Sequence, residues 1–250
     1  MAGHSKWANI KHKKGAADQK RAKVFTKIAK EVTVAARLGG GDLDANPRLR
    51  RAISSARAVS MPKDNIDRAI KKGTGEMGDV DFEEITFEGY GAGGVAVMVD
   101  CLTDNRNRTV SEVRFAFKKG NGSMGENGSV AWVFETKGVI GFNEMDGLDV
   151  EKLQEVAILN GAEDIEEDSD SVTIYSSTED FDALSSAIEE AGFQPQRSEV
   201  AKVPSNTVEC SGEMADDVIK LINLLEDLDD VQNVSANFDI SDEELERIYS

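Results

Sequence analysis

Apolar positions recur with a helical period through the first third of the chain. Over residues 16–38, apolar side chains return every three to four residues, which predicts an amphipathic helix that ends at the glycine run 39–41. An N-cap asparagine before Pro47 predicts the start of a second helix, and a third is predicted from near Pro62 to Gly73. The pattern therefore predicts a small helical domain at the amino end.

Beyond residue 81 the pattern changes to short β-type runs separated by helical stretches. In chain order it predicts strands at 85–88 and 95–102, a helix at 106–119, strands at 129–135 and 137–143, a helix at 150–160, strands at 164–167 and 171–176, a helix at 178–191, strands at 193–202 and 206–211, a helix at 213–228 and a strand at 231–239. The order βαββαβ between 137 and 202 is the split ferredoxin-like plan. The flanking segments 95–135 and 206–239 each have the order strand, helix, strand.

The predicted fold class is therefore α+β and multi-domain: a helical N-terminal domain plus two ferredoxin-like α/β sandwiches, one inserted into the other. The predicted domains are residues 1–75, a discontinuous domain of 82–135 plus 204–240, and an inserted domain of 136–203.

Charge divides along the same boundary. The 250 residues carry 29 Lys+Arg and 47 Asp+Glu, a net charge of −18. Residues 1–75 hold 18 of the cations and 6 of the acids, a net of +12, which leaves 11 cations and 41 acids, a net of −30, for residues 76–250. Such asymmetry points to polyanion binding by the basic end, although the basic domain could instead dock on its own acidic neighbour.

The candidate nucleic-acid-binding residues are the cations of that basic end, with an aromatic ring and an imidazole among them. They are Lys6, Trp7, Lys11, His12, Lys13, Lys14, Lys20, Arg21, Lys23, Lys27, Lys30, Arg48, Arg50, Arg51, Lys63, Arg68, Lys71 and Lys72. Lys20, Lys23, Lys27 and Lys30 recur at spacings of three and four, so they share one face of the first helix. Lysines neutralise phosphates. Residues 1–15 are predicted to form an extended arm, and Trp7 could stack on an unpaired base or anchor this arm to the protein.

Motifs for catalysis are lacking. Residues 89–94 satisfy GxGxxG, but a strand-like run follows rather than a helix, so a glycine hairpin is expected instead of a dinucleotide site. His4 and His12 are the only histidines, and no HExxH, CxxC or nucleophile elbow occurs. We therefore predict a protein that is not an enzyme and that has no catalytic residues, metal or cofactor.

The remaining composition favours a cytoplasmic protein without a membrane partner. No apolar run approaches the roughly 18 residues that span a bilayer, and the basic start has no apolar h-region of a secretory signal. Cys101 and Cys210 lie in apolar or β-branched runs, where buried reduced thiols are expected.

Four long segments together resemble the YebC/PmpR family. They are MAGHSKWANIKHKK at 1–14, MPKDNIDRAIKKGTGE at 61–76, EGYGAGGVAVMVDCLTDNRNRT at 88–109 and GSMGENGSVAWVFETKG at 122–138. Ala92 stands where the family usually has proline. The resemblance implies three domains, one of them discontinuous, in a probable DNA-binding transcriptional regulator, and it supplies no catalytic residues.

Other functions stay open at this point. The family includes a mitochondrial translational activator of cytochrome oxidase, so a ribosome-associated factor binding ribosomal or transfer RNA is the main alternative. The lysine-rich arm suits backbone recognition and leans slightly towards RNA. An enzyme for an anionic substrate would need a pocket of converging pKa-shifted groups. An adaptor would recruit a protein partner through the acidic α/β domains.

Overall fold

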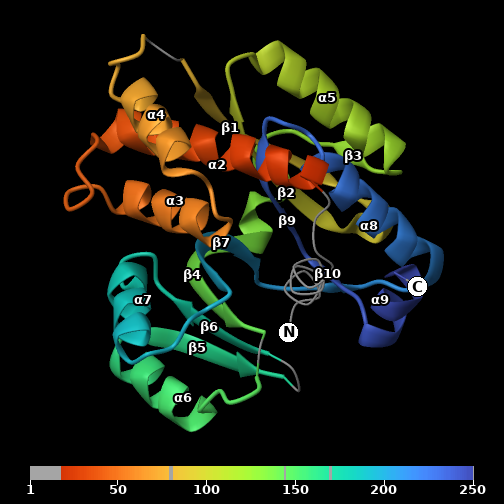
Figure 1. The fold of residues 1–250 in the computed structure, drawn as a ribbon. Coiled ribbons are helices and arrows are strands. Elements are labelled where there is room, and N and C mark those ends of the chain that lie inside the picture. The colour runs from red at the N-terminus through yellow and green to blue at the C-terminus, as the bar shows by residue number, and fades with distance from the viewer. Residues whose placement is uncertain (1–17, 79–80, 144, 169–170, 250) are drawn as a thin grey trace.

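The fold is described from a computed structural model, which defines residues 18–78, 81–143, 145–168 and 171–249. Figure 1 shows a helical unit packed against a central α/β unit, with a second sheet and its helices below these two units in this view. The predicted fold class, α+β with several domains, is confirmed.

The helical unit, here called the head, consists of α2 (Asp18–Gly39), α3 (Pro47–Ala58) and α4 (Lys63–Gly73). Asn46 caps α3 by accepting the Leu49 N–H at 3.0 Å, and its amide donates to the carbonyl of Ala35 at 2.8 Å. Buried side chains of the three helices form one core. At the end of α4, a Cβ on Gly73 would lie 2.3 Å from the Thr33 carbonyl oxygen, so only glycine permits this approach of α4 to α2.

The central unit is an antiparallel sheet covered on one face by two helices. Its strand order is β3 (Ser123–Met124), β1 (Glu83–Tyr90), β2 (Ala96–Thr103) and β9 (Val231–Ala236). The helices α5 (Arg106–Lys119) and α8 (Gly212–Glu226) share its largest core cluster. A short parallel pair, β8 (Val208–Glu209) and β10 (Phe238–Asp239), and the helix α9 (Asp242–Tyr249) complete it.

The second sheet is built from the intervening chain. Its order is β5 (Ala162–Glu167), β6 (Val172–Ser176), β4 (Phe134–Phe142) and β7 (Arg197–Pro204), with α6 (Val150–Leu159) and α7 (Phe181–Glu190) between strands in the sequence. This is the strand order of the split ferredoxin-like plan. The two sheets thus divide the strands as one unit interrupted by another, while the predicted domain bounds stay a prediction.

The strand predicted at 129–135 is wrong. Residues Ala131–Val133 form the 3-10 helix η2, and β4 then runs unbroken from Phe134 to Phe142. The local cause is Glu88 of β1, whose side chain is buried and accepts the N–H groups of Gly128, Val130 and Ala131 at 2.7, 2.8 and 2.9 Å. These donors are then not free for a strand ladder, and the two-residue β3 takes the edge position beside β1.

This carboxylate provides a test of the loop. Burial alone would raise the pKa of Glu88, but three backbone N–H donors outweigh it and hold the pKa below its ordinary value of 4.5. The stabilisation is therefore present above about pH 4.5 and is lost as pH falls through the lower, folded-state pKa. We expect Glu88→Gln to reduce the free energy of unfolding at pH 7 by about 1–3 kcal/mol, because its amide group would face N–H donors.

Urea unfolding at pH 7 and in acid measures this effect, which should shrink in acid. Glu126→Gln is the matched control, since Glu126 is exposed in the same loop. Equal stability of the two variants at pH 7 would contradict the role given to Glu88.

Candidate nucleic-acid interface

The predicted site residues fall into three groups. Lys6, Trp7, Lys11, His12, Lys13 and Lys14 lie outside the described residues. Lys20 and Arg21 belong to the start of α2, but their side chains also lie outside the description. The other ten, together with Arg37 and Arg57, can be placed in the head.

The lysine row of α2, formed by Lys23, Lys27 and Lys30, faces the body of the protein. Lys23 Nζ donates to the Asp227 carbonyl oxygen at 3.0 Å and to its carboxylate at 3.2 Å. Lys27 Nζ donates to the carbonyl oxygen of Glu226 at 2.6 Å. These carbonyls lie at the carboxyl end of α8, where unpaired C=O groups and the helix dipole attract cations.

Lys30 completes this contact at a buried carboxylate. Its Nζ lies 2.7 Å from Asp230 Oδ1, and the two side chains are only 15% and 3% exposed. Asp230 also accepts from Arg108 at 2.6 Å and from Thr109 at 2.8 Å. Burial alone would raise the pKa of Asp230, but these donors outweigh it and lower that pKa to about 2.

The same face of α2 continues with apolar and arginine contacts. Val34 packs in a buried cluster with Phe82 and Leu102 of the central unit. Arg37 then donates to the Phe82 carbonyl oxygen at 2.6 Å and pairs with Asp81 at 3.3 Å. Residues 23, 27, 30, 34 and 37 follow the spacing of one helical stripe, so this stripe is a docking face of the head on the body.

Two arginines of α3 are also neutralised. Arg48 Nε lies 2.7 Å from Glu31 Oε1, and a second nitrogen pairs with Glu84. Arg51 forms two hydrogen bonds with the carboxylate of Asp182, at 2.7 and 2.9 Å, and lies 5.9 Å from the centre of the Phe181 ring. Arg51 therefore ties the head to the second sheet rather than facing solvent.

The remaining head cations form what we call the outer head surface. Its members, all exposed, are Arg50, Arg57, Lys63, Arg68, Lys71 and Lys72. Arg50 donates to two carbonyl oxygens of the loop before α3, and Lys72 lies 5.9 Å from the centre of the Phe82 ring. Within the described part of the chain, no carboxylate lies within 4.0 Å of the side-chain nitrogens of any of the six. Asp64 and Asp67 interrupt this surface on α4 and reduce its net charge.

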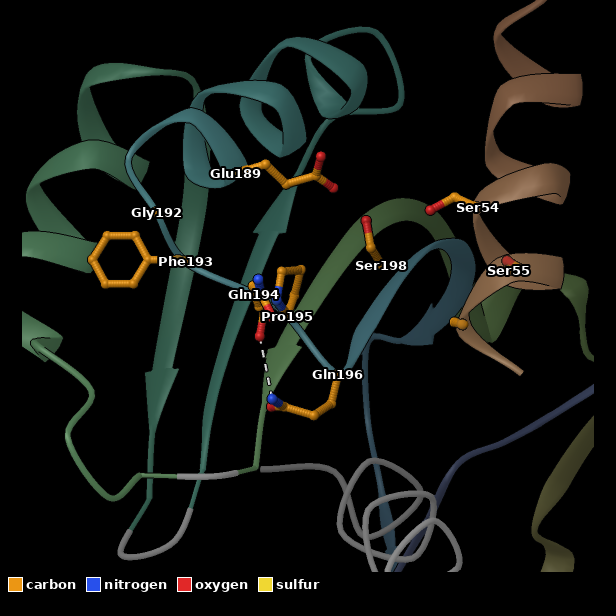
Figure 2. Close-up of a pocket in the computed structure, with 10 residues that line it drawn as sticks. Ser54, Ser55, Glu189, Gly192, Phe193, Gln194, Pro195, Gln196 and Ser198 are labelled. Carbon is orange, nitrogen blue, oxygen red and sulfur yellow. Dashed lines mark hydrogen bonds between the residues drawn. The ribbon is translucent and has the colours of Figure 1, made fainter. Parts of the chain in front are cut away.

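A cleft of about 420 Å³ separates α3 from the second sheet, and Figure 2 shows its lining residues. Ser54 and Ser55 reach it from α3, and Glu189, Gln196 and Ser198 reach it from the other side. Among the described residues that line it, Glu189 is the only ionisable one. The cleft therefore offers no cation to a phosphate, and it brings no acid–base pair together.

A second cleft, of about 450 Å³, lies where the head meets the start of β1 and α5. Its cations are Arg37 and Arg106, which already pair with Asp81 and Glu83. The surrounding carboxylates make this cleft unsuitable for a polyanion.

Cysteine chemistry is equally unfavourable. Burial raises the pKa of Cys101 to about 12 and that of Cys210 to about 11, so both are held as thiols at neutral pH.

Among the residues that the structure defines, no group of three His, Cys, Asp or Glu side chains could hold a metal ion. No helix in the same residues is both long and apolar enough to cross a bilayer.

Sequence reasoning missed one cationic element, helix α5. Arg114, Lys118 and Lys119 are exposed there, and in the described residues no carboxylate lies within 4.0 Å of their side-chain nitrogens. The signal was present in the sequence, because α5 holds five of the eleven cations of residues 76–250. The net charge of −30 of that segment concealed it.

These features define a multi-domain α+β protein in which a helical domain with a cationic outer surface is docked on an acidic body. Comparison with known proteins shows the family to which this chain belongs. The TACO1/YebC protein N-terminal domain matches residues 5–76, and the TACO1/YebC second and third domain matches residues 82–238. The chain belongs to the TACO1/YebC family, which confirms the resemblance drawn from its motifs.

Relatives that match this chain over its length have names that describe a function. A protein of Trichlorobacter lovleyi is 55% identical over 248 residues, which cover 99% of this chain and 100% of the relative. A protein of Geobacter sulfurreducens is 54% identical with the same coverage. Both are named probable transcriptional regulatory proteins, so the family is one of regulators. The crystal structure of a conserved hypothetical protein from Aquifex aeolicus matches with a TM-score of 0.84 and 46% identity, covering 91% of this chain and 94% of that one.

Proposed function

We propose that this protein is a cytoplasmic, non-enzymatic regulator of gene expression that binds DNA through its head. The observation that carries the proposal is the outer head surface, whose six exposed cations have no carboxylate partner among the described side chains. Exposed cations without a carboxylate partner can bind the phosphates of nucleic acid and release counterions. This release supplies most of the sequence-independent affinity of a protein for nucleic acid. The basic arm predicted at residues 1–15 adds further cations to the same end of the chain.

The docking face of the head has a different role in this proposal. Lys23, Lys27 and Lys30 hold α2 on the carboxyl end of α8, so their ammonium groups are already engaged by the body while the head is docked. The remaining candidates of the arm, and Lys20 and Arg21 at the start of α2, stay proposed contacts. Arg48 and Arg51 are proposed as structural, because each is paired with a carboxylate.

We expect the combined substitution Arg57→Gln, Lys63→Gln, Arg68→Gln and Lys71→Gln to weaken binding of duplex DNA at least about tenfold. Each lost phosphate contact should also reduce the slope of log K against log salt by about 0.9. The measurement is fluorescence anisotropy of a labelled duplex titrated with the full chain at several salt concentrations.

Lys220→Gln is the matched control, because Lys220 is an exposed cation of α8 and is not part of the outer head surface. Affinity and salt slope in the fourfold variant equal to those of the control would exclude the outer head surface. Thermal unfolding of the variant should match the wild type, since all four side chains are exposed.

The alternative function is a ribosome-associated translation factor that binds ribosomal or transfer RNA. One observation favours it, the exposed aromatic ring of Phe115 among the cations of α5. Co-sedimentation with ribosomes through sucrose gradients distinguishes the two functions. Absence from ribosomal fractions at low salt, together with tight duplex binding, would exclude the translation factor.

A further inference from the structure

Helix α5 is a cationic element within an acidic body. Its fourteen residues include five cations and one acid, Glu112, whereas residues 76–250 as a whole have a net charge of −30. In Figure 1 it lies on the outside of the central unit, beside α8. A helix of this sign on a body of the opposite sign is unusual enough to require a physical reason.

The first turns of α5 have such a reason in the fold. Arg106 pairs with Glu83 at 2.6 Å, and Arg108 pairs with Asp104 at 2.9 Å and with the buried Asp230 at 2.6 Å. These two arginines therefore serve the fold. Their contacts do not extend to the second half of the helix.

The second half of α5 presents an unpaired outer face. Arg114, Phe115 and Lys118 are one, three and four positions apart, so they lie together on the side opposite the buried Val113 and Phe117. Lys119 adjoins them in the last turn. Glu112 borders this face, three positions before Phe115 and seven before Lys119, but among the described residues it forms no ion pair within 4.0 Å with these cations.

Helix stability explains only part of this composition. Lysines in the last turn interact favourably with the helix dipole, which accounts for Lys118 and Lys119. It does not account for Phe115, whose side chain is 65% exposed between Arg114 and Lys118. An exposed aromatic ring flanked by cations is the combination with which proteins bind single-stranded nucleic acid, because the ring stacks on a base while the cations meet phosphates.

The neighbouring helix decides between a single strand and a duplex. The first turns of α8 carry the acids Glu213 and Asp217, besides Asp216, which pairs with Arg247 at 2.9 Å. Asp217 accepts a hydrogen bond from Asn121 just beyond the end of α5. A duplex broad enough to reach α5 would be repelled by these acids. A single strand can follow α5 alone, and its unpaired bases are available to Phe115.

We propose that the outer face of α5, formed by Arg114, Phe115, Lys118 and Lys119, binds a single-stranded segment of nucleic acid. Phe115 stacks on one base, and the three cations contact the adjoining phosphates. This inference goes beyond the proposed function, because it assigns a second binding surface that does not depend on the head.

Two variants of the full chain test the proposal. Phe115→Leu keeps an apolar side chain but removes the stacking ring, and the triple variant Arg114→Gln, Lys118→Gln and Lys119→Gln removes the phosphate contacts. Lys220→Gln on the adjacent α8 is the matched control. The probes are a labelled oligouridine and a labelled oligothymidine of about 12 nucleotides, and a labelled DNA duplex, each followed by fluorescence anisotropy.

We expect Phe115→Leu to weaken binding of a single strand about five- to a hundredfold and to change duplex affinity less than about twofold. The triple variant should flatten the single-strand salt slope by about 0.7 per lost phosphate. Loss of oligouridine binding alone identifies RNA as the ligand, and loss of both single strands shows that the sugar is not read; either supports the proposal.

The proposal is overturned if both α5 variants bind the single strands as tightly as Lys220→Gln does. This holds also if the same variants lose binding of an acidic protein partner. An equal loss of duplex and single-strand binding in Phe115→Leu also overturns it, because stacking requires an unpaired base. The variant with four substitutions in the outer head surface is expected to weaken binding of the duplex probe. Failure of the proposed head function is therefore measured with the duplex, and failure of the α5 proposal is measured with the single strands.

Discussion

Replacement of Asp230 by alanine is expected to lower the free energy of unfolding by about 3–5 kcal/mol. Asp230 is buried, and its carboxylate accepts hydrogen bonds from Lys30 of the head and from Arg108, Thr103 and Thr109 of the body. Removing it leaves the largely buried ammonium group of Lys30 without this carboxylate and leaves Arg108 paired with Asp104, which is the costly way to break a buried ion pair. Guanidinium unfolding followed by circular dichroism measures the change.

Asp229→Ala is the control for this variant. Asp229 is exposed, and the contact that it makes with Lys30 uses the backbone carbonyl oxygen, which the substitution retains. We expect the control to change the free energy of unfolding by no more than about 0.5 kcal/mol. Two variants of equal stability would show that Asp230 does not hold the head on the body.

The pH dependence gives a second measurement on the same residue. The pKa of Asp230 falls from its ordinary value of 3.8 to about 2 in the folded protein. Its contribution is therefore complete above about pH 4 and is lost as pH falls from there towards 2. The difference in stability between wild type and Asp230→Ala should decrease over this range, and a constant difference would contradict the assignment.

Local signals predicted much of this fold. The helix predicted at 106–119 agrees with α5, and the predicted start at Pro47 agrees with α3, because caps and helical period depend on neighbouring residues. The break predicted between 135 and 137 is absent, since β4 pairs with β7 from Phe134 to Gly141. That register depends on residues about sixty positions away. The final helix α9 was not predicted at all.

The candidate site shows the same division. Helical spacing placed Lys23, Lys27 and Lys30 on one face, which is correct, but it could not show what that face contacts. The partners of Lys23, Lys27 and Lys30 are residues 226–230, about two hundred positions away. Docking of the basic domain on its acidic neighbour, the alternative considered for the charge asymmetry, therefore applies to this row and not to the outer head surface.

The two phenylalanines of α5 have opposite surroundings in the structure. Phe117 is fully buried, and a Cβ on Gly89 of β1 would lie 2.6 Å from its ring, so the ring packs directly on the strand backbone. Phe115 is 65% exposed. Two residues along a helix turn the side chain by about 200°, so a buried position and an exposed one follow from one period.

We therefore expect Phe117→Ala to lower the free energy of unfolding by about 3–5 kcal/mol, through lost burial and the cavity left beside Gly89 and Gly122. Phe115→Ala should cost no more than about 0.5 kcal/mol, because little of its ring leaves water on folding. Urea unfolding of both variants measures the contrast. A large loss in Phe115→Ala would mean that the ring is needed for the fold, and the exposed face of α5 would then lose its reason to bind a base.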